Sequence, residues 1–270
     1  MMAGNSGSAS TPMRTARLVV RLREHDWLAA MIELVIVVVG ILIALQVSNW
    51  NQERVDRNRA QSYYRRLHAD LLADRRAMDL TQAFWTKVGR YGDAAIANGE
   101  AGKLADGSEW KTVLSWYQAG QIMPFELSDT TYNEMRGGGD LALIADENLR
   151  KQLADYYRLS GTGIEANLLH HDPVYRLQVR GLTPWPVQQY VWSHCFNETS
   201  AVMTQQLIDC PSPISDQQAA AILAGYRQSP SLLDNLRTWM ATLQVSHYAL
   251  ANARDDAVRL TSEIEAAQKH

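Results

Sequence analysis

The side chains that could carry metal or redox chemistry gather in the second half of the chain. His170, His171 and His194 are potential metal ligands, and Cys195 and Cys210 follow. A metal site needs three or four converging ligands, whereas adjacent histidines on a helix point to different sides of it. Histidines near the end of a helix are explained more simply by the negative end of its dipole. We therefore expect no metal and no other cofactor here, and a hydrolase or metal-dependent enzyme using the three histidines is the second alternative.

Cys195 and Cys210 have fourteen residues between them, in a stretch punctuated by prolines. A disulfide that closes such a loop contributes about 3 kcal/mol in the chain-entropy model. No C-x-x-C motif is present, so a thioredoxin-like redox role is not supported. We expect a structural disulfide, with two free thiols as the alternative.

Three aromatic residues in the same Pro-rich segment, 173–213, form a candidate ligand pocket. They are Trp185, Tyr190 and Trp192. Aromatic side chains of this kind combine an apolar body with a polar handle, which suits a wet binding surface. This segment motivates the first alternative function, a membrane-bound ligand-sensing subunit.

Other patterns exclude common activities. The tract of three glycines at 137–139 follows no expected strand and precedes no Lys-Ser/Thr pair, so it is not a phosphate-binding loop. G-x-S-x-G and H-E-x-x-H motifs are absent, and the formal net charge is −3. Nucleic-acid-binding domains are usually basic. We therefore expect neither catalytic residues nor a nucleic-acid partner.

The element that must position everything else is a long apolar segment near the start of the chain. Residues 28–47 contain only Glu33 and Gln46 as polar side chains, and Trp27 and Trp50 flank them. About 20 helical residues cross a hydrocarbon core of roughly 30 Å, and tryptophans favour the two water–lipid interfaces. This pattern predicts one transmembrane helix that is retained in the mature protein.

Charge and cysteine usage predict how that helix is oriented. Four arginines precede the apolar segment (Arg14, Arg17, Arg21 and Arg23), which favours a cytoplasmic N-terminus. Arginines also follow the segment, but acidic residues are interleaved with them. The two cysteines suit an oxidising compartment. We expect a disordered or basic cytoplasmic tail at 1–26, a transmembrane helix at 27–50 and an extracytoplasmic domain at 51–270.

One face of the predicted transmembrane helix could associate with another helix. Gly40, Ala44 and Ser48 recur every four residues, and Glu33 projects from roughly the same side. Small residues at this spacing let two helix backbones approach closely in lipid. The expected partners are therefore the lipid bilayer and other membrane proteins or a second copy of this chain. The competing interpretation is that Glu33 only reaches the headgroup region or is protonated.

Two long helices should dominate the rest of the chain. Residues 51–88 lack Gly and Pro, and their partial three–four apolar spacing is broken by Asp74 and Thr81, while Gly89 and Gly92 predict loops. The last helix, starting at Ser229 and Pro230, carries a heptad seam. The seam comprises Leu236, Trp239, Leu243, Ser246, Leu250, Ala253, Ala257, Leu260, Ile264 and Ala267. Between the two, Ser108 and Asp146 are expected to cap shorter helices.

These elements predict an all-α fold in which the N-terminal transmembrane helix continues into a helical bundle with two long antiparallel helices. The stretch from Glu33 to Asn51 resembles a group of single-pass bacterial membrane proteins of unknown function, which share a Glu, an apolar run with Gly, an A-L-Q tract and a W-N exit. A second stretch resembles the same group at Thr131, Tyr132, Glu134, Met135, Gly139, Leu141, Leu143, Ile144, Leu149, Arg150, Leu153, Tyr156 and Tyr157. The resemblance implies a bacterial inner-membrane protein with a periplasmic domain, but it implies no activity. The function expected from the sequence is a non-enzymatic interaction or scaffold module that could self-associate.

Overall fold

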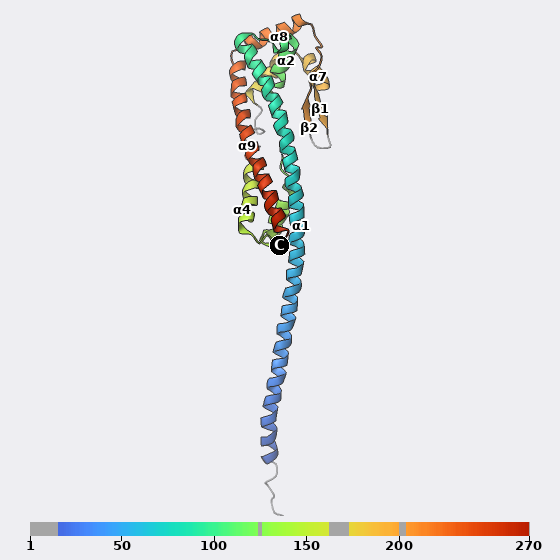
Figure 1. Cartoon of the computed structure of the whole chain (residues 1–270), viewed down its shortest axis with the longest axis vertical. Helices are drawn as coiled ribbons and strands as arrows, with labels where there is room; N and C mark the ends of the chain where they lie inside the picture. Colours follow the sequence, from blue (N-terminus) through green and yellow to red (C-terminus); the bar gives the residue numbers. More distant parts are fainter. Residues whose placement is uncertain (1–15, 124–125, 162–172, 200–203, 270) are drawn as a thin grey trace, which may run out of the picture. The chain divides into compact units, whose positions relative to one another are not determined.

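The computed structural model describes residues 16–123, 126–161, 173–199 and 204–269, and its regular structure is almost entirely helical (Figure 1). The helices are α1 (Ala16–Ala101), α2 (Glu109–Gln118), α3 (Thr130–Gly138), α4 (Glu147–Tyr156), α6 (Val174–Leu182), α7 (Trp185–His194), α8 (Asp216–Gln228) and α9 (Leu232–Ala267). Shorter elements are η1 (Ala105–Gly107), η2 (Asp140–Leu143), η3 (Tyr157–Gly161), β1 (Phe196–Thr199) and β2 (Thr204–Leu207). The all-α prediction is confirmed.

The chain divides into two compact units, Met1–Arg59 and Ala60–His270, and α1 contributes residues to both. In the first unit, every side chain from 27 to 50 is exposed. This part of α1 is long and apolar enough to cross a membrane, and no residue of its most apolar stretch is buried. Because α1 begins at Ala16, residues 16–26 of the predicted disordered or basic tail are helical, while residues 1–15 lie outside the described part.

In the second unit, α9 runs back along the second half of α1, as Figure 1 shows. Leu233 lies against Gly99 near the start of α9, and Trp85 contacts His247 midway. Further along, Arg254 donates to Asp79 at 2.5 Å. The predicted seam is the buried face of α9: nine of its members are buried, and Ala267 is half-buried. The antiparallel pair of long helices is therefore confirmed.

Shorter helices pack at both ends of this pair. Where α1 ends, Trp116 of α2 packs against Tyr175 of α6 and Tyr226 of α8, with ring centroids 6.5 and 5.6 Å apart. Towards the end of α9, Gln152 of α4 donates to Glu263 at 2.9 Å. The pocket described below lies between these two clusters and is lined by residues of α1 and α9.

Two predicted helix boundaries are confirmed and two are wrong. Ser108 and Asp146 cap α2 and α4 through their side chains. However, α1 continues past Gly89 and Gly92 to Ala101. The helix persists across these glycines because this part of α1 packs against α9. The last helix begins at Leu232, two residues after Pro230, because Ser229 already serves as the C-cap of α8.

A small antiparallel hairpin of β1 and β2 was not expected from the sequence. Phe196 pairs with Leu207, and the backbone N–H of Ile208 donates to the carbonyl of Cys195 at 2.8 Å. Each strand has four residues, which is too short for an alternating apolar pattern. The hairpin depends on long-range contacts instead: Lys87 of α1 donates to the carbonyl of Leu207 at 2.6 Å, and Trp110 of α2 donates to that of Cys210 at 2.9 Å.

Candidate functional site

The predicted histidine cluster is only partly described. His170 and His171 lie outside the described residues, and His194 is exposed at the end of α7, where its ring stacks on Tyr190 with centroids 4.2 Å apart. Within the described ranges, no group of three or more His, Cys, Asp or Glu residues is placed to hold a metal ion.

Cys195 and Cys210 lie at disulfide distance, with Cα atoms 5.1 Å apart. They flank the hairpin, and Cys195 is buried. Gln118 of α2 donates to the carbonyl of Cys195 at 3.1 Å. The pair therefore connects the two ends of the hairpin at the point where the hairpin meets α2.

The three aromatic residues of the predicted pocket have separate surroundings. Trp185 is 65% exposed. Tyr190 packs edge-on against Trp110, and Trp192 packs edge-on against Phe196, with ring centroids 6.1 and 4.8 Å apart, respectively. A shared pocket of these three side chains stays a prediction.

The predicted association face lies in the first unit. Glu33, Gly40, Ala44 and Ser48 are all exposed, and a Cβ atom added at Gly40 would meet nothing within 4 Å. The pairing of this face with another helix stays a prediction.

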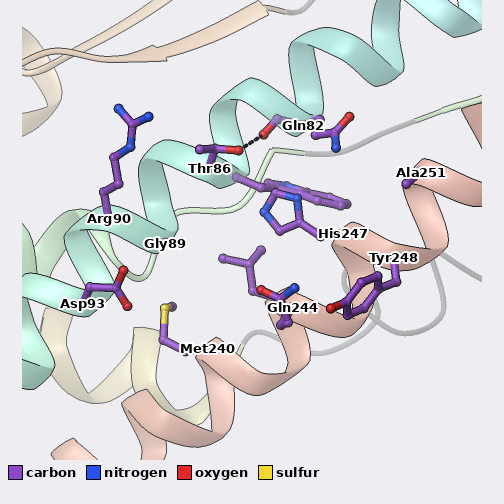
Figure 2. A pocket seen from close by; sticks show the side chains of 12 residues that line it. Gln82, Thr86, Gly89, Arg90, Asp93, Met240, Gln244, His247, Tyr248 and Ala251 are labelled. Atoms are coloured by element: carbon purple, nitrogen blue, oxygen red, sulfur yellow. Dashed lines mark hydrogen bonds between the residues drawn. The ribbon is translucent and has the colours of Figure 1, made fainter.

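A pocket that the sequence did not predict lies between α1 and α9 (Figure 2). Its volume is about 540 Å³, within the range of roughly 300–1,000 Å³ typical of small-molecule sites. We call it the α1/α9 pocket; its walls come from residues 82–93 of α1 and 240–251 of α9. Both walls belong to the second unit and face each other because the two helices are antiparallel.

The floor of the α1/α9 pocket is apolar. Trp85 and Leu243 are 1% and 2% exposed, and Met240 lies beside them. Gly89 adds depth, because a Cβ atom there would meet nothing within 4 Å. At Gly92 a Cβ atom would instead lie 2.1 Å from the sulfur of Met240. Gly92 therefore lets Met240 of α9 pack closely against α1, whereas Gly89 leaves the pocket open to solvent.

His247 forms the inner edge of this pocket. Its ring meets Trp85 edge-on, with centroids 5.7 Å apart and planes at 82°. Burial lowers the pKa of His247 below its usual value, and a hydrogen bond to the backbone of Trp85 opposes this effect only in part. The imidazole is therefore neutral at pH 7 and presents a polar but uncharged surface.

The charged groups of the pocket are confined to one end. In Figure 2, Arg90 and Asp93 extend from α1 on the left, whereas Gln82 and Tyr248 lie on the right. Arg90 and Asp93 are exposed and make no hydrogen bond or ion pair with any described residue. Their charges are therefore available to a ligand.

A buried carboxylate forms a second polar centre, between α1 and α4. Asp74 is 1% exposed and accepts hydrogen bonds from the backbone N–H of Ser128 at 2.7 Å and from the hydroxyl of Tyr156 at 2.8 Å. Burial raises the pKa of Asp74 despite these hydrogen bonds, which act to lower it. This group is a structural acceptor, since both of its oxygens are engaged.

The α1/α9 pocket was not predicted from the sequence, because Gly89 and Gly92 were expected to lie in loops rather than inside α1. The available signal was the pattern G-x-x-G at 89–92 within otherwise helical sequence, since glycines inside a helix often mark close approach of another element. Locating the pocket also needed the register of α9 on α1. Comparison with protein-family models, curated proteins and solved structures finds no match to this chain, so the resemblance noted in the sequence stays a prediction.

Proposed function

We propose that this chain is a non-enzymatic recognition module that α1 anchors in the bacterial inner membrane, with the N-terminus in the cytoplasm and the folded unit in the periplasm. The observation that carries the anchor is the run of exposed apolar side chains in α1, none of whose most apolar window is buried. A core helix of a soluble protein buries such side chains, and lipid is the other environment in which their exposure costs nothing.

The direction across the membrane is supported by charge and by the cysteine pair. Arg14, Arg17, Arg21 and Arg23 precede the apolar segment, and arginines are retained on the cytoplasmic side. Cys195 and Cys210 lie at disulfide distance in the folded unit, which fits an oxidising compartment. Both observations favour a periplasmic folded unit.

Recognition is assigned to the α1/α9 pocket. Its apolar floor, neutral His247 and two unpaired charges are the combination found in small-molecule sites. The α1/α9 pocket supports the ligand-sensing alternative, whose predicted pocket in the 173–213 segment stays a prediction. No observation on the described residues favours the hydrolase alternative.

Alkaline extraction of membranes from cells that express the full chain tests the anchor. We expect the chain to stay in the membrane pellet and to need detergent for release. The double variant Val38→Arg/Leu42→Arg should move a large fraction into the soluble phase, since each arginine near mid-bilayer costs about 2.5–3.5 kcal/mol.

The matched control introduces two arginines at exposed apolar positions of the folded unit, Leu177→Arg/Val245→Arg. Both positions are more than half exposed (57% and 63%), so this variant should remain in the pellet like the wild type. A wild-type chain that washes off at alkaline pH would contradict the anchor.

A further inference from the structure

We propose that the α1/α9 pocket binds a small zwitterion, an α-amino acid with an apolar or aromatic side chain. This inference rests on the proposed recognition function and adds the chemical class of the ligand. It starts from Arg90 and Asp93, two charges of opposite sign that have no partner among the described residues and line one end of the same pocket.

The two charges are neighbours that do not neutralise each other. Arg90 and Asp93 lie three positions apart on α1, so their side chains leave the same side of the helix. Elsewhere in the structure, arginines near carboxylates are paired, as in Arg237–Glu100 at 2.6 Å and Arg254–Asp79 at 2.5 Å. Arg90 and Asp93 have no such partner among the described residues. They therefore present separate positive and negative groups to whatever enters the pocket.

These groups match the two charges of an amino acid. A guanidinium forms bidentate hydrogen bonds with a carboxylate, and a carboxylate accepts from an ammonium group. With His247 neutral, Arg90 and Asp93 bring the formal charge of the lining to zero. An anion would leave Asp93 uncompensated, and a cation would leave Arg90 uncompensated, so the lining favours a molecule that carries both charges.

The rest of the pocket suits an apolar side chain. The floor beside the charged end is formed by Trp85, Met240 and Leu243. Gly89 leaves the space above this floor open. Indole and thioether groups both make favourable contacts with aromatic rings. An aromatic side chain of the ligand would lie on this floor while its charged groups remain near Arg90 and Asp93.

Three compounds with the same phenyl group separate the contributions of the charges. L-Phenylalanine carries both charges, 2-phenylethylamine carries only the ammonium group and 3-phenylpropionate only the carboxylate. Calorimetric titration of the full chain in detergent micelles at pH 7 should give L-phenylalanine at least tenfold tighter binding than either analogue. Glycine, which lacks the apolar group, should bind more weakly than L-phenylalanine by a similar factor.

Two variants assign each charge to its residue. In Arg90→Gln, L-phenylalanine should lose about tenfold in affinity, whereas 2-phenylethylamine should bind at least as tightly as to the wild type. In Asp93→Asn, L-phenylalanine should lose about as much, whereas 3-phenylpropionate should bind at least as tightly as to the wild type. The controls Arg76→Gln and Asp255→Asn remove exposed charges that do not line the pocket, and they should leave all affinities unchanged.

Gly89→Leu separates loss of binding from loss of fold. A Cβ atom at this position meets nothing within 4 Å, and Leu favours the helix more than Gly does, so the melting temperature of the variant should not fall while binding of all three compounds is lost. Equal affinity for the three compounds, lost in Gly89→Leu, would overturn the zwitterion but retain the pocket as a recognition site. Absence of L-phenylalanine binding, or binding that Gly89→Leu leaves intact, would overturn this inference, whereas the membrane anchor is judged separately by alkaline extraction.

Discussion

Asp74 shows how tertiary contacts accommodate a buried polar residue that interrupts a sequence pattern. It breaks the apolar spacing of α1, yet its carboxylate is buried and engaged by Ser128 and Tyr156. Both partners lie more than fifty positions away in the sequence (54 and 82). The polar residue at position 74 was visible in the sequence. The hydrogen bonds from Ser128 and Tyr156 that compensate for its burial could not be predicted, because they are tertiary contacts.

Replacing Asp74 by Asn should change how stability depends on pH. Burial raises the pKa of Asp74 in the folded state, so the folded protein binds this proton more tightly than the unfolded chain does. The contribution of Asp74 to stability is therefore fully present below its unfolded pKa of about 3.9 and is lost as pH rises through the folded pKa. Asn keeps a carbonyl acceptor for Ser128 and does not ionise.

We expect the unfolding free energy of Asp74→Asn, relative to wild type, to rise between pH 4 and pH 7. Urea denaturation of the full chain in micelles across this range measures it. Asp255→Asn removes an exposed carboxylate on α9 and should follow the wild-type profile. A profile for Asp74→Asn parallel to that of the wild type would contradict the role of burial.

Among the elements, α1 and α9 form the frame of the folded unit, and the glycines of α1 decide how the two helices meet. The periodic seam of α9 predicted its buried face correctly, because a heptad pattern is local to the helix. The glycines of α1 were misjudged, because a glycine in a sequence can end a helix or admit a neighbour. Gly92 lies against Met240 and Gly99 against Leu233, so these two glycines admit α9 rather than end α1.

Alanine substitutions at two of these glycines should have opposite effects on stability. At Gly89 a Cβ atom meets nothing within 4 Å, so Gly89→Ala should stabilise by about 0.5–1 kcal/mol through helix propensity. At Gly99 it would lie 2.8 Å from Leu233 and 3.3 Å from the buried ring of Trp116, so Gly99→Ala should destabilise by about 1 kcal/mol or more. Thermal unfolding of the two variants, each the control for the other, compares them directly; equal shifts would contradict the packing described here.

At the scale of the whole molecule, the sequence predicted more of the architecture than of the site. The apolar segment, the two long helices, their antiparallel order and the proximity of Cys195 and Cys210 all follow from local patterns or from a single pair of residues. The hairpin and the α1/α9 pocket do not, because each depends on segments far apart in the sequence. The pocket forms only in the register of α9 on α1 that places Trp85 against His247. No local sequence pattern predicts that register.

We propose that α1 holds a folded recognition unit on the periplasmic side of the inner membrane. Protease treatment of spheroplasts and of inside-out membrane vesicles, both carrying the full chain with a C-terminal epitope, tests it most directly. We expect the epitope to be lost in spheroplasts while a cytoplasmic marker protein stays intact, and to be protected in inside-out vesicles until detergent is added. An epitope that is protected in spheroplasts and digested in inside-out vesicles would contradict the claim.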